Sequence, residues 1–319
     1  MIHEKIFLHE NRNDVTLTTY VLDDSHEMLA DKSRGAVLIC PGGAYLGCSD
    51  REAEPVAMAF AAMGYHAFVL RYSVYTDGSS FPDFSQPILP KEHCIFPNPM
   101  LDIAKAMLYI RSKATTWLVD TDKIAICGFS AGGHNCAMYS VYWNKPLVTE
   151  LFNVPAEQLR PAASILCYPV TDYLLMKSNA SSDPMAQGLF KIANIAYFGT
   201  DNPDDALMEQ VSPARLVNEH TPPTFLWTTY EDKLTPPIQA TAMAHALAIA
   251  NIPFELHVFE EGPHGLSLST AATSGNKSMI DNNAAKWIDL CAEWLKNALR
   301  LSYLTHSLLY NGTKSRGQK

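Results

Sequence analysis

The fold is decided by Lys123-Ile-Ala-Ile-Cys127-Gly-Phe-Ser130-Ala-Gly132, a short apolar run followed by a glycine-rich turn. The run Lys123–Cys127 is typical of a strand buried in a parallel sheet, and Ala131–Tyr142 follows it as a predicted helix. Between them, Gly128–Gly132 matches the pattern G-x-S-x-G. A serine in this strand–turn–helix setting is typical of a nucleophile elbow. The alternative is that Ser130 only caps the helix.

Short apolar runs alternate with helical patterns on both sides of this stretch. Further strands are expected at Ala36–Cys40, Ala67–Leu70, Ala163–Cys167, Thr224–Thr228 and Phe254–Phe259, and the alternating run Val15–Val21 predicts a strand near the sheet edge. Further helices are expected at Asp50–Met63, around Leu101–Ile110, at Pro237–Ala250 and at Ala284–Leu299. This alternation predicts an α/β fold, with a mostly parallel sheet and helices on both faces.

Three segments break the alternation. A long polar loop is expected at Ser73–Asn98, and Asp172–Thr200 has no clean period, which predicts a small inserted cap. The cap is too short to form a domain, so residues 1–300 are expected to form a single domain. Residues 301–319 form an extension after the last helix, and its final residues are expected to be flexible.

The composition predicts a large folded core and excludes several classes of partner. Of the 319 residues, 47% are hydrophobic and 18% are charged, and the net charge is −9. Extensive disorder is therefore excluded, and neither nucleic acid nor a membrane is expected as a partner. The first residues lack the pattern of a secretory signal, and the odd number of cysteines predicts buried thiols in a reducing, cytoplasmic location. No metal-ligand spacing is present, and no cofactor is expected.

A serine hydroxyl becomes an effective nucleophile only beside a base that takes its proton and an acid that orients the base. The best candidate base is His264, in a Gly/Pro-rich loop directly after the last strand. Such loops converge at the carboxyl ends of parallel strands. The acid should follow the preceding strand, where Asp232 and Glu231 compete, and Asp172 is a third candidate. His134 fits packing or hydrogen bonding at the helix start better than catalysis.

Attack on a carbonyl group creates a negative oxygen that preorganised backbone N–H groups must stabilise. The N–H of Ala131 is one candidate donor. The segment Pro41-Gly-Gly-Ala-Tyr45 follows a buried strand directly, and its glycines allow the backbone to approach a substrate closely. The alternative is that this segment is only a tight turn.

Taken together, these motifs resemble the α/β-hydrolase fold and, more narrowly, the acetyl esterase/lipase group related to hormone-sensitive lipase-type carboxylesterases and acetylxylan esterases. The resemblance covers about Ala36 to Leu299. It rests on Cys40-Pro-Gly-Gly-Ala-Tyr45, Gly128-Phe-Ser-Ala-Gly-Gly133, Tyr168-Pro169, Ser212-Pro213, Pro222-Pro-Thr-Phe225, Glu231-Asp-Lys-Leu-Thr-Pro236 and Gly262-Pro-His-Gly265. This sequence departs from the family pattern at two positions of the loop after the first buried strand. Pro41 stands where many relatives have histidine, and Ala44 replaces a third glycine.

The resemblance implies residues for each role in the site. The triad would be Ser130 as nucleophile, Asp232 as orienting acid and His264 as base. The oxyanion donors would be the N–H groups of Gly43, Ala44 and Ala131. The pocket walls would include Tyr45, Tyr75 and Phe81.

The function implied is hydrolysis of carboxylic esters with short acyl groups through an acyl-enzyme. Acetylated sugars or xylo-oligosaccharides are candidate substrates, so the expected partner is a small-molecule ester, and a homodimer is a candidate assembly. Two alternatives stay open. One is a peptidase of the same fold, and the other is a binding protein without catalysis.

Overall fold

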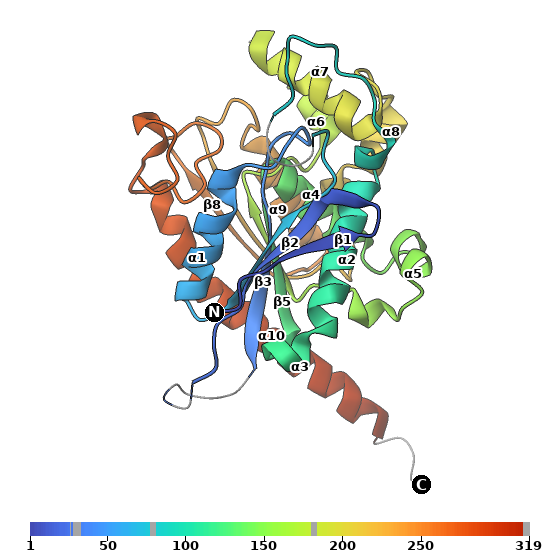
Figure 1. The fold of residues 1–319 in the computed structure, drawn as a ribbon, viewed down its shortest axis with the longest axis vertical. Coiled ribbons are helices and arrows are strands. Elements are labelled where there is room, and N and C mark those ends of the chain that lie inside the picture. The colour runs from blue at the N-terminus through green and yellow to red at the C-terminus, as the bar shows by residue number, and fades with distance from the viewer. Residues whose placement is uncertain (26, 28–32, 77–80, 180–183, 315–319) are drawn as a thin grey trace.

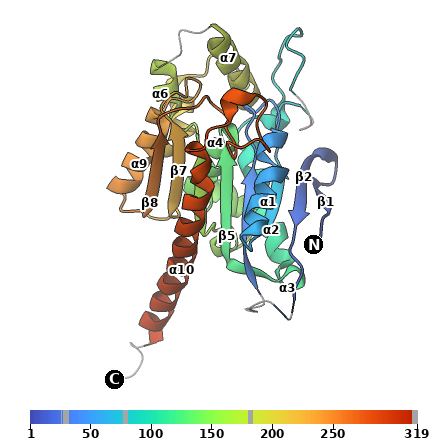
Figure 2. The same cartoon turned by 90° about the vertical axis from the view of Figure 1, so that its left-hand side faces the viewer.

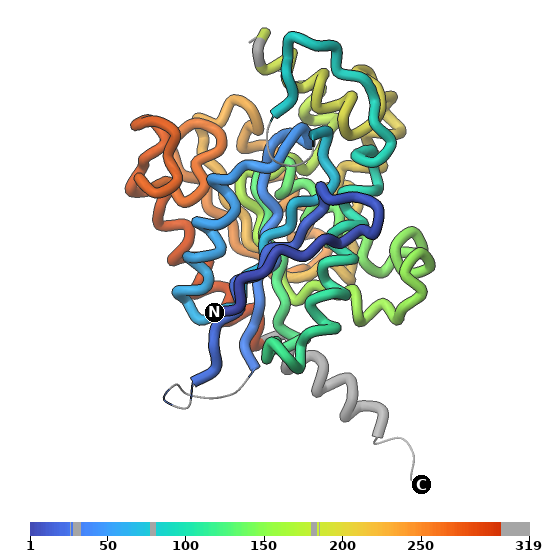
Figure 3. The backbone as a smooth tube through the Cα atoms, in the orientation of Figure 1, coloured from blue at the N-terminus to red at the C-terminus, as the bar shows by residue number. Residues whose placement is uncertain are grey.

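The computed structural model describes residues 1–25, 27, 33–76, 81–179 and 184–314 (Figure 1). The predicted loop, cap and C-terminal extension each include residues outside these ranges. The tail that the sequence predicts to be flexible begins at about residue 311; residues 311–314 belong to the last helix, and 315–319 lie outside the described residues. Figure 3 follows the backbone from the N-terminal strands through the sheet to the last helix.

The described residues form one sheet of eight strands in the order β1-β2-β4-β3-β5-β6-β7-β8. β1 and β2 are antiparallel to their neighbours, whereas all pairings from β4 to β8 are parallel. The strands are β1 Lys5–His9, β2 Arg12–Tyr20, β3 Arg34–Cys40, β4 His66–Arg71, β5 Val119–Phe129, β6 Ala163–Cys167, β7 Thr224–Thr229 and β8 Phe254–Phe259. The predicted mostly parallel sheet is therefore confirmed.

The edge strand β1 is absent from the sequence prediction. Its side chains are only partly buried, so no continuous apolar run marks it. β1 covers the outer side of β2, which accordingly lies one position inside the edge. The strands in the middle of the sheet are easier to predict, because burial on both faces requires nearly continuous apolar sequence.

The helices cover both faces of the sheet. They are α1 Glu54–Ala62, α2 Asn98–Ser112, α3 Ala114–Trp117, α4 Ala131–Tyr142, α5 Pro146–Phe152, α6 Tyr173–Ser178, α7 Pro184–Phe198, α8 Asp205–Gln210, α9 Ile238–Ile249 and α10 Trp287–Lys314. Residues of α2, α4 and α9 belong to one apolar cluster, and residues of α1 and α10 belong to the other. The two clusters lie on opposite faces, since neighbouring β3 residues alternate between them.

The last helix is longer than the sequence predicts. The prediction ends it at Leu299, but α10 continues to Lys314 (Figure 2). Its inward face is apolar: Trp287, Cys291 and Leu295 are fully buried. Leu290 and Trp294 are partly buried against the same cluster.

The predicted cap consists largely of helices. α6 and α7 come from the segment 172–200, and Figure 1 shows them with α8 beyond the carboxyl ends of the parallel strands. α6 has only six residues, which is too short for a helical period to be recognised. In α7, Gly188 is a weak helix former in the first half of the helix, so the sequence pattern there is indistinct.

Candidate active site

Ser130 lies at a strained turn between β5 and α4. Its backbone has φ 51° and ψ −117°, a conformation that side-chain-bearing residues rarely adopt. The flanking glycines make this turn sterically feasible. A Cβ on Gly132 would lie 2.0 Å from the carbonyl oxygen of Cys40, and one on Gly128 would lie 2.1 Å from that of Gly132. The G-x-S-x-G pattern is therefore a steric requirement of this turn.

The structure brings Ser130, His264 and Asp232 into one hydrogen-bonded series. The Nε2 atom of His264 lies 2.8 Å from Ser130 Oγ, and its Nδ1 atom lies 2.7 Å from Asp232 Oδ2. Asp232 follows β7 and His264 follows β8, as predicted. Glu231, which competed with Asp232 in the sequence, instead accepts a hydrogen bond from the Gly262 N–H. The catalytic roles of these residues stay predictions.

The Asp232 carboxylate is almost completely buried and richly hydrogen-bonded. Its Oδ1 atom accepts the N–H groups of Leu234 and Thr235, each at 2.9 Å. The Thr235 hydroxyl lies 2.9 Å from both Asp232 Oδ2 and His264 Nδ1. Thr235 lies in the motif Glu231–Pro236, but no local sequence pattern predicts its contact with the imidazole. These contacts orient the carboxylate toward the imidazole.

The electrostatic surroundings of His264 favour its protonated form. Burial alone lowers the pKa of the imidazole, but the charge and hydrogen bond of Asp232, with the charge of Glu52, raise the pKa above its ordinary value. Arg51 acts in the opposite direction. The site can therefore hold the imidazolium that forms when a base accepts a proton from serine.

The backbone after β3 forms a loop beside Ser130, with three consecutive residues, Gly43, Ala44 and Tyr45, at positive φ. Among the described residues, no acceptor is found for the backbone N–H of Gly43, Ala44 or Ala131. Ala44 and Ala131 line the same cavity as Ser130, whereas Gly43 does not. An oxyanion hole needs N–H groups without another acceptor, so the three residues stay predicted donors.

Buried side chains hold this loop in place. Tyr72 donates its hydroxyl proton to the Pro41 carbonyl at 2.8 Å, and Gly42 donates its N–H to Glu52 Oε2 at 2.7 Å. On the far side, the Tyr45 hydroxyl lies 2.6 Å from Nδ1 of His134.

His134 is a neutral hydrogen-bonding residue in this arrangement. Burial lowers the pKa of its imidazole to about 4. Its Nε2 atom lies 2.8 Å from the Val211 carbonyl oxygen, so this nitrogen carries the proton and Nδ1 accepts from Tyr45. The residue connects α4 to the Pro41–Tyr45 loop, in agreement with the predicted packing or hydrogen-bonding role.

A cavity of about 260 Å³ opens beside Ser130. Its walls come from the body of the protein and from α6 and α7, so the segment 172–200 does shape the pocket. Most lining side chains are apolar, including Tyr45, Tyr173, Met176, Leu189, Phe190 and Leu234. Lys191 and Lys233 add positive charge to the lining.

Two predicted pocket residues lie elsewhere. Tyr75 is buried, its hydroxyl accepts the N–H of Leu89, and Lys91 Nζ lies 4.1 Å from its ring centroid. Phe81 is 52% exposed to solvent. Neither residue lines the cavity in the described part of the chain. Leu89 and Lys91 from further along the loop contact Tyr75, and residues of α7 line the cavity instead.

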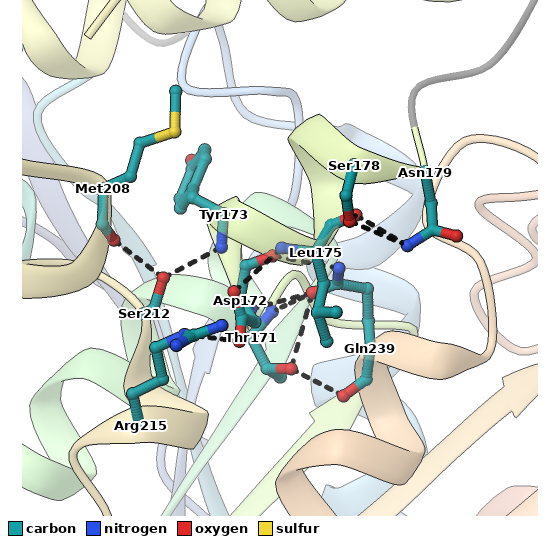
Figure 4. A network of polar contacts seen from close by, with 10 residues as sticks. All are labelled: Thr171, Asp172, Tyr173, Leu175, Ser178, Asn179, Met208, Ser212, Arg215 and Gln239. Atoms are coloured by element: carbon teal, nitrogen blue, oxygen red, sulfur yellow. Dashed lines mark hydrogen bonds and ion pairs between the residues drawn. The ribbon is translucent and has the colours of Figure 1, made fainter. Parts of the chain in front are cut away.

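Asp172 belongs to the attachment of the cap and not to the triad (Figure 4). Its Oδ1 atom accepts the N–H of Leu175, which caps α6, and its Oδ2 atom pairs with Arg215 Nε at 2.7 Å. The side-chain oxygen of Gln239 accepts the N–H groups of Thr171 and Asp172, both at 2.8 Å. α6 is therefore fixed to α9 and to the segment after α8.

Two properties of the described residues bear on the kind of site. No group of three or more His, Cys, Asp or Glu side chains is placed to hold a metal ion. None of the described helices has both the length and the apolar sequence that crossing a membrane requires.

Comparison with known proteins finds α/β-hydrolase enzymes and esterases among the chains that are similar to this one. The BD-FAE family model matches residues 89–247, a segment that contains Ser130 and Asp232. An α/β-hydrolase enzyme, MGS-M1, from a Medee basin deep-sea metagenome library is 34% identical. The match covers 94% of this chain and 98% of the other chain, with a TM-score of 0.69.

An acetyl ester-xyloside bifunctional hydrolase from Caldicellulosiruptor lactoaceticus is 28% identical. The match covers 92% of this chain and 96% of the other, with a TM-score of 0.68. Endo-1,4-beta-xylanase B from Butyrivibrio fibrisolvens is 32% identical over 75% of this chain but only 33% of its own length. The chain spans between a third and about half of the length of the curated relatives that it matches.

Proposed function

The chain belongs to the α/β-hydrolase family of enzymes, and we propose that it is a carboxylesterase acting through Ser130, His264 and Asp232. The family assignment confirms the resemblance drawn from the sequence motifs. One observation carries the proposal: Asp232, His264 and Ser130 are connected by hydrogen bonds of 2.7 and 2.8 Å, and Ser130 lines the cavity. A binding protein without catalysis would not need this arrangement to be intact.

In the first half of the proposed reaction, Ser130 Oγ attacks the ester carbonyl carbon while His264 Nε2 takes the hydroxyl proton. The carbonyl electrons move to its oxygen, which meets the backbone N–H groups of Ala44 and Ala131, with Gly43 as the third predicted donor. As the tetrahedral intermediate collapses, the bond to the alcohol oxygen breaks. The alcohol leaves with the proton from His264, and the acyl group stays on Ser130.

In the second half, water attacks the acyl carbon and gives its proton to His264 Nε2. The second tetrahedral intermediate then collapses, the bond between the acyl carbon and Ser130 Oγ breaks, and Oγ recovers the proton. The carboxylic acid is released and the enzyme returns to its starting state. Asp232 orients the imidazole throughout and stabilises its protonated form.

The proposed substrates are esters of short carboxylic acids, with acetylated sugars as the leading class. The moderate cavity volume and its mainly apolar lining suit a small acyl group. The similarity to an acetyl ester-xyloside hydrolase supports acetyl groups on sugars. A homodimer and a cytoplasmic location stay predictions from the sequence.

The first test measures initial hydrolysis rates of p-nitrophenyl acetate, butyrate and octanoate for the wild type and Ser130→Ala. We expect kcat to fall by about 10³-fold or more in the variant, because the nucleophile is removed while the binding site remains. Acetate or butyrate should exceed octanoate in kcat/KM. A matched control is Ser140→Ala, the same change on the same helix at a buried hydroxyl that donates to the Cys136 carbonyl.

The Ser140→Ala control should keep nearly wild-type rates. Equal, near-background rates for the wild type and Ser130→Ala would contradict the esterase proposal. A faster rate on octanoate than on acetate would keep the serine mechanism but contradict the short-acyl preference.

A further inference from the structure

Glu52 is a buried carboxylate that the reaction steps above do not use. It ends the short 3-10 helix Asp50–Glu52 after the Pro41–Tyr45 loop and is 4% exposed. Its Oε2 atom accepts the N–H of Gly42 at 2.7 Å, and its Oε1 atom lies 2.7 Å from the hydroxyl of Tyr168. A carboxylate in a protein interior is costly unless its oxygens are paired, so this position calls for an explanation.

The hydrogen-bond directions show that Glu52 accepts at both of its oxygens. The Tyr168 oxygen accepts the N–H of Ser267 at 2.9 Å, which leaves its own proton free to point at Glu52. Burial raises the pKa of Tyr168 far above its ordinary value, so this hydroxyl keeps its proton. Both Glu52 oxygens therefore accept hydrogen bonds, which is the pattern of a carboxylate.

The two hydrogen bonds of Glu52 lead to the two halves of the proposed site. Gly42 directly precedes Gly43 and Ala44, the predicted oxyanion donors. Tyr168 makes two contacts with residues 264–273, which we call the His264 segment. Its oxygen accepts the Ser267 N–H, and its ring packs edge-on against the His264 ring at 5.1 Å between centroids. One buried carboxylate thus connects the oxyanion loop to the segment that carries the base.

The preceding residue strengthens this connection from the same short helix. Arg51 donates from Nε to the Thr273 carbonyl at 2.6 Å and from its guanidinium to the Gly265 carbonyl. The Ser267 hydroxyl in turn donates to the Arg51 carbonyl. The helix Asp50–Glu52 is therefore joined to the His264 segment by several hydrogen bonds.

We propose that Glu52 is a positioning residue that holds the oxyanion loop and the His264 segment in register. This inference rests on the proposed esterase function. Glu52 touches neither substrate nor reacting atoms, and it acts through Gly42 and Tyr168. Small displacements of such groups reduce the rate strongly, because the oxyanion donors must meet a specific atom position.

The charge of Glu52 has a separate consequence for pH dependence. The charged groups that act on His264 are Asp232 from the loop after β7, and Glu52 and Arg51 from the short helix. Tyr168, after β6, faces the imidazole as a neutral group. Loss of the Glu52 charge leaves Asp232 opposed by Arg51. The acidic limb of the kcat/KM profile, which reports neutral His264, should therefore move to lower pH.

The test compares Glu52→Gln with the wild type on p-nitrophenyl acetate between pH 5 and 9. We expect kcat to fall by about 10- to 100-fold with KM changed by less than about threefold, because the lost positioning acts on the transition state. The acidic limb should move to lower pH. The matched control is Glu54→Gln, which removes the same charge from an exposed side chain two residues away. This control should change neither kcat nor the position of the acidic limb.

Tyr168→Phe separates positioning from charge and covers the case in which Glu52→Gln does not fold. This variant removes both hydrogen bonds of the Tyr168 hydroxyl, to Glu52 and from the Ser267 N–H, but keeps the carboxylate. We therefore expect kcat to fall by about fivefold or more, and the acidic limb should not move to lower pH. A folded Glu52→Gln with kcat within about twofold of wild type and an unmoved limb would overturn the proposal. If Glu52→Gln does not fold, kcat within about twofold in Tyr168→Phe overturns it.

Failure of this inference can be told apart from failure of the esterase proposal. Ser130→Ala is measured in the same assay. If the wild type is no faster than Ser130→Ala, the esterase proposal fails. If the wild type is active and Ser130→Ala is not, while Glu52→Gln matches the wild type, only the role of Glu52 fails.

Discussion

The conformation of Ser130 and the role of His134 depend on the contacts of each residue as well as on its own chemistry. Ser130 is held at φ 51° because Gly128 and Gly132 leave room for the carbonyl groups that surround the turn. His134 lies four residues further along the same chain and remains neutral in a buried hydrogen-bonded position. The two side chains differ in role because one faces the cavity and the other faces the core.

The lowered pKa of His134 predicts a loss of stability in acid. An unfolded histidine, with an ordinary pKa of about 6.5, takes up a proton as the pH falls through that value, whereas the folded one does so only near 4. The stabilising contribution is therefore present above about pH 6.5 and is lost as the pH falls toward 4. At pH 4.5 this loss should amount to about 2–3 kcal/mol in the free energy of unfolding.

Urea unfolding of the wild type and His134→Gln at pH 7.5 and 4.5 measures this contribution. The wild type should lose about 2–3 kcal/mol more than the variant between the two pH values, since the variant has no imidazole to protonate. His220→Gln, a change at an exposed histidine, is the control and should follow the wild type. Equal pH dependence in the wild type and His134→Gln would contradict the prediction.

Among the elements, α6 depends on polar contacts more than on its own helix-forming tendency. It has six residues and would not be stable alone in water. The Asp172 carboxylate caps it and pairs with Arg215, and Gln239 of α9 contacts the segment that precedes it (Figure 4). The wall of the cavity formed by Tyr173 and Met176 therefore depends on these contacts.

Gln239→Leu should destabilise the protein by about 2–4 kcal/mol, because the buried N–H groups of Thr171 and Asp172 lose their acceptor. Urea unfolding at pH 7.5 measures the change. The control is Gln158→Leu, at an exposed glutamine, which should stay within about 0.5 kcal/mol of the wild type. A Gln239→Leu protein as stable as this control would show that the network does not hold α6.

At the scale of the whole molecule, the sheet topology brings the site together. Asp232, His264 and the Pro41–Tyr45 loop follow β7, β8 and β3, while Ser130 follows β5. All four strands are parallel, so their carboxyl ends lie at one edge of the sheet. The cap lies beyond the same edge (Figure 1). Segments more than 200 residues apart in sequence, from Pro41 to His264, therefore meet at one place.

The low reactivity expected of the cysteine thiols is another property that depends on the fold of the whole molecule. All seven cysteines are free and buried, as the odd count and the apolar surroundings in the sequence predict. Burial raises the pKa of Cys48 to about 12 and that of Cys94 to about 11. Thiols in this state are poor nucleophiles and are also sheltered from reagents.

Thiol titration with Ellman's reagent should therefore find almost no reactive cysteine in the native protein at pH 8, because only exposed thiolates react quickly. In 6 M guanidinium chloride without reductant, all seven thiols of the chain should react. Fewer than seven in the denatured protein would indicate a disulfide. Rapid labelling of the native protein would show that a cysteine is accessible.

The sequence by itself determined the elements that have strong local signals. The strands β6 and β8 and the helix α4 have the predicted bounds. The reason is that buried strands require continuous apolar runs, and the glycine pattern around Ser130 marks a turn that other residues cannot form. The residues of the proposed triad were also nameable from the sequence, although the choice between Asp232 and Glu231 depended on a resemblance to known proteins.

Only the tertiary structure decided which distant residues meet. Glu52 and Tyr168 are 116 positions apart, Tyr45 and His134 are 89 apart, and no local pattern predicts either contact. The same holds for the pocket, where α7 and not Phe81 lies beside Ser130. Periodicity records only which face of an element is buried. The partner of a buried polar group depends on how the sheet and the cap bring separate segments together.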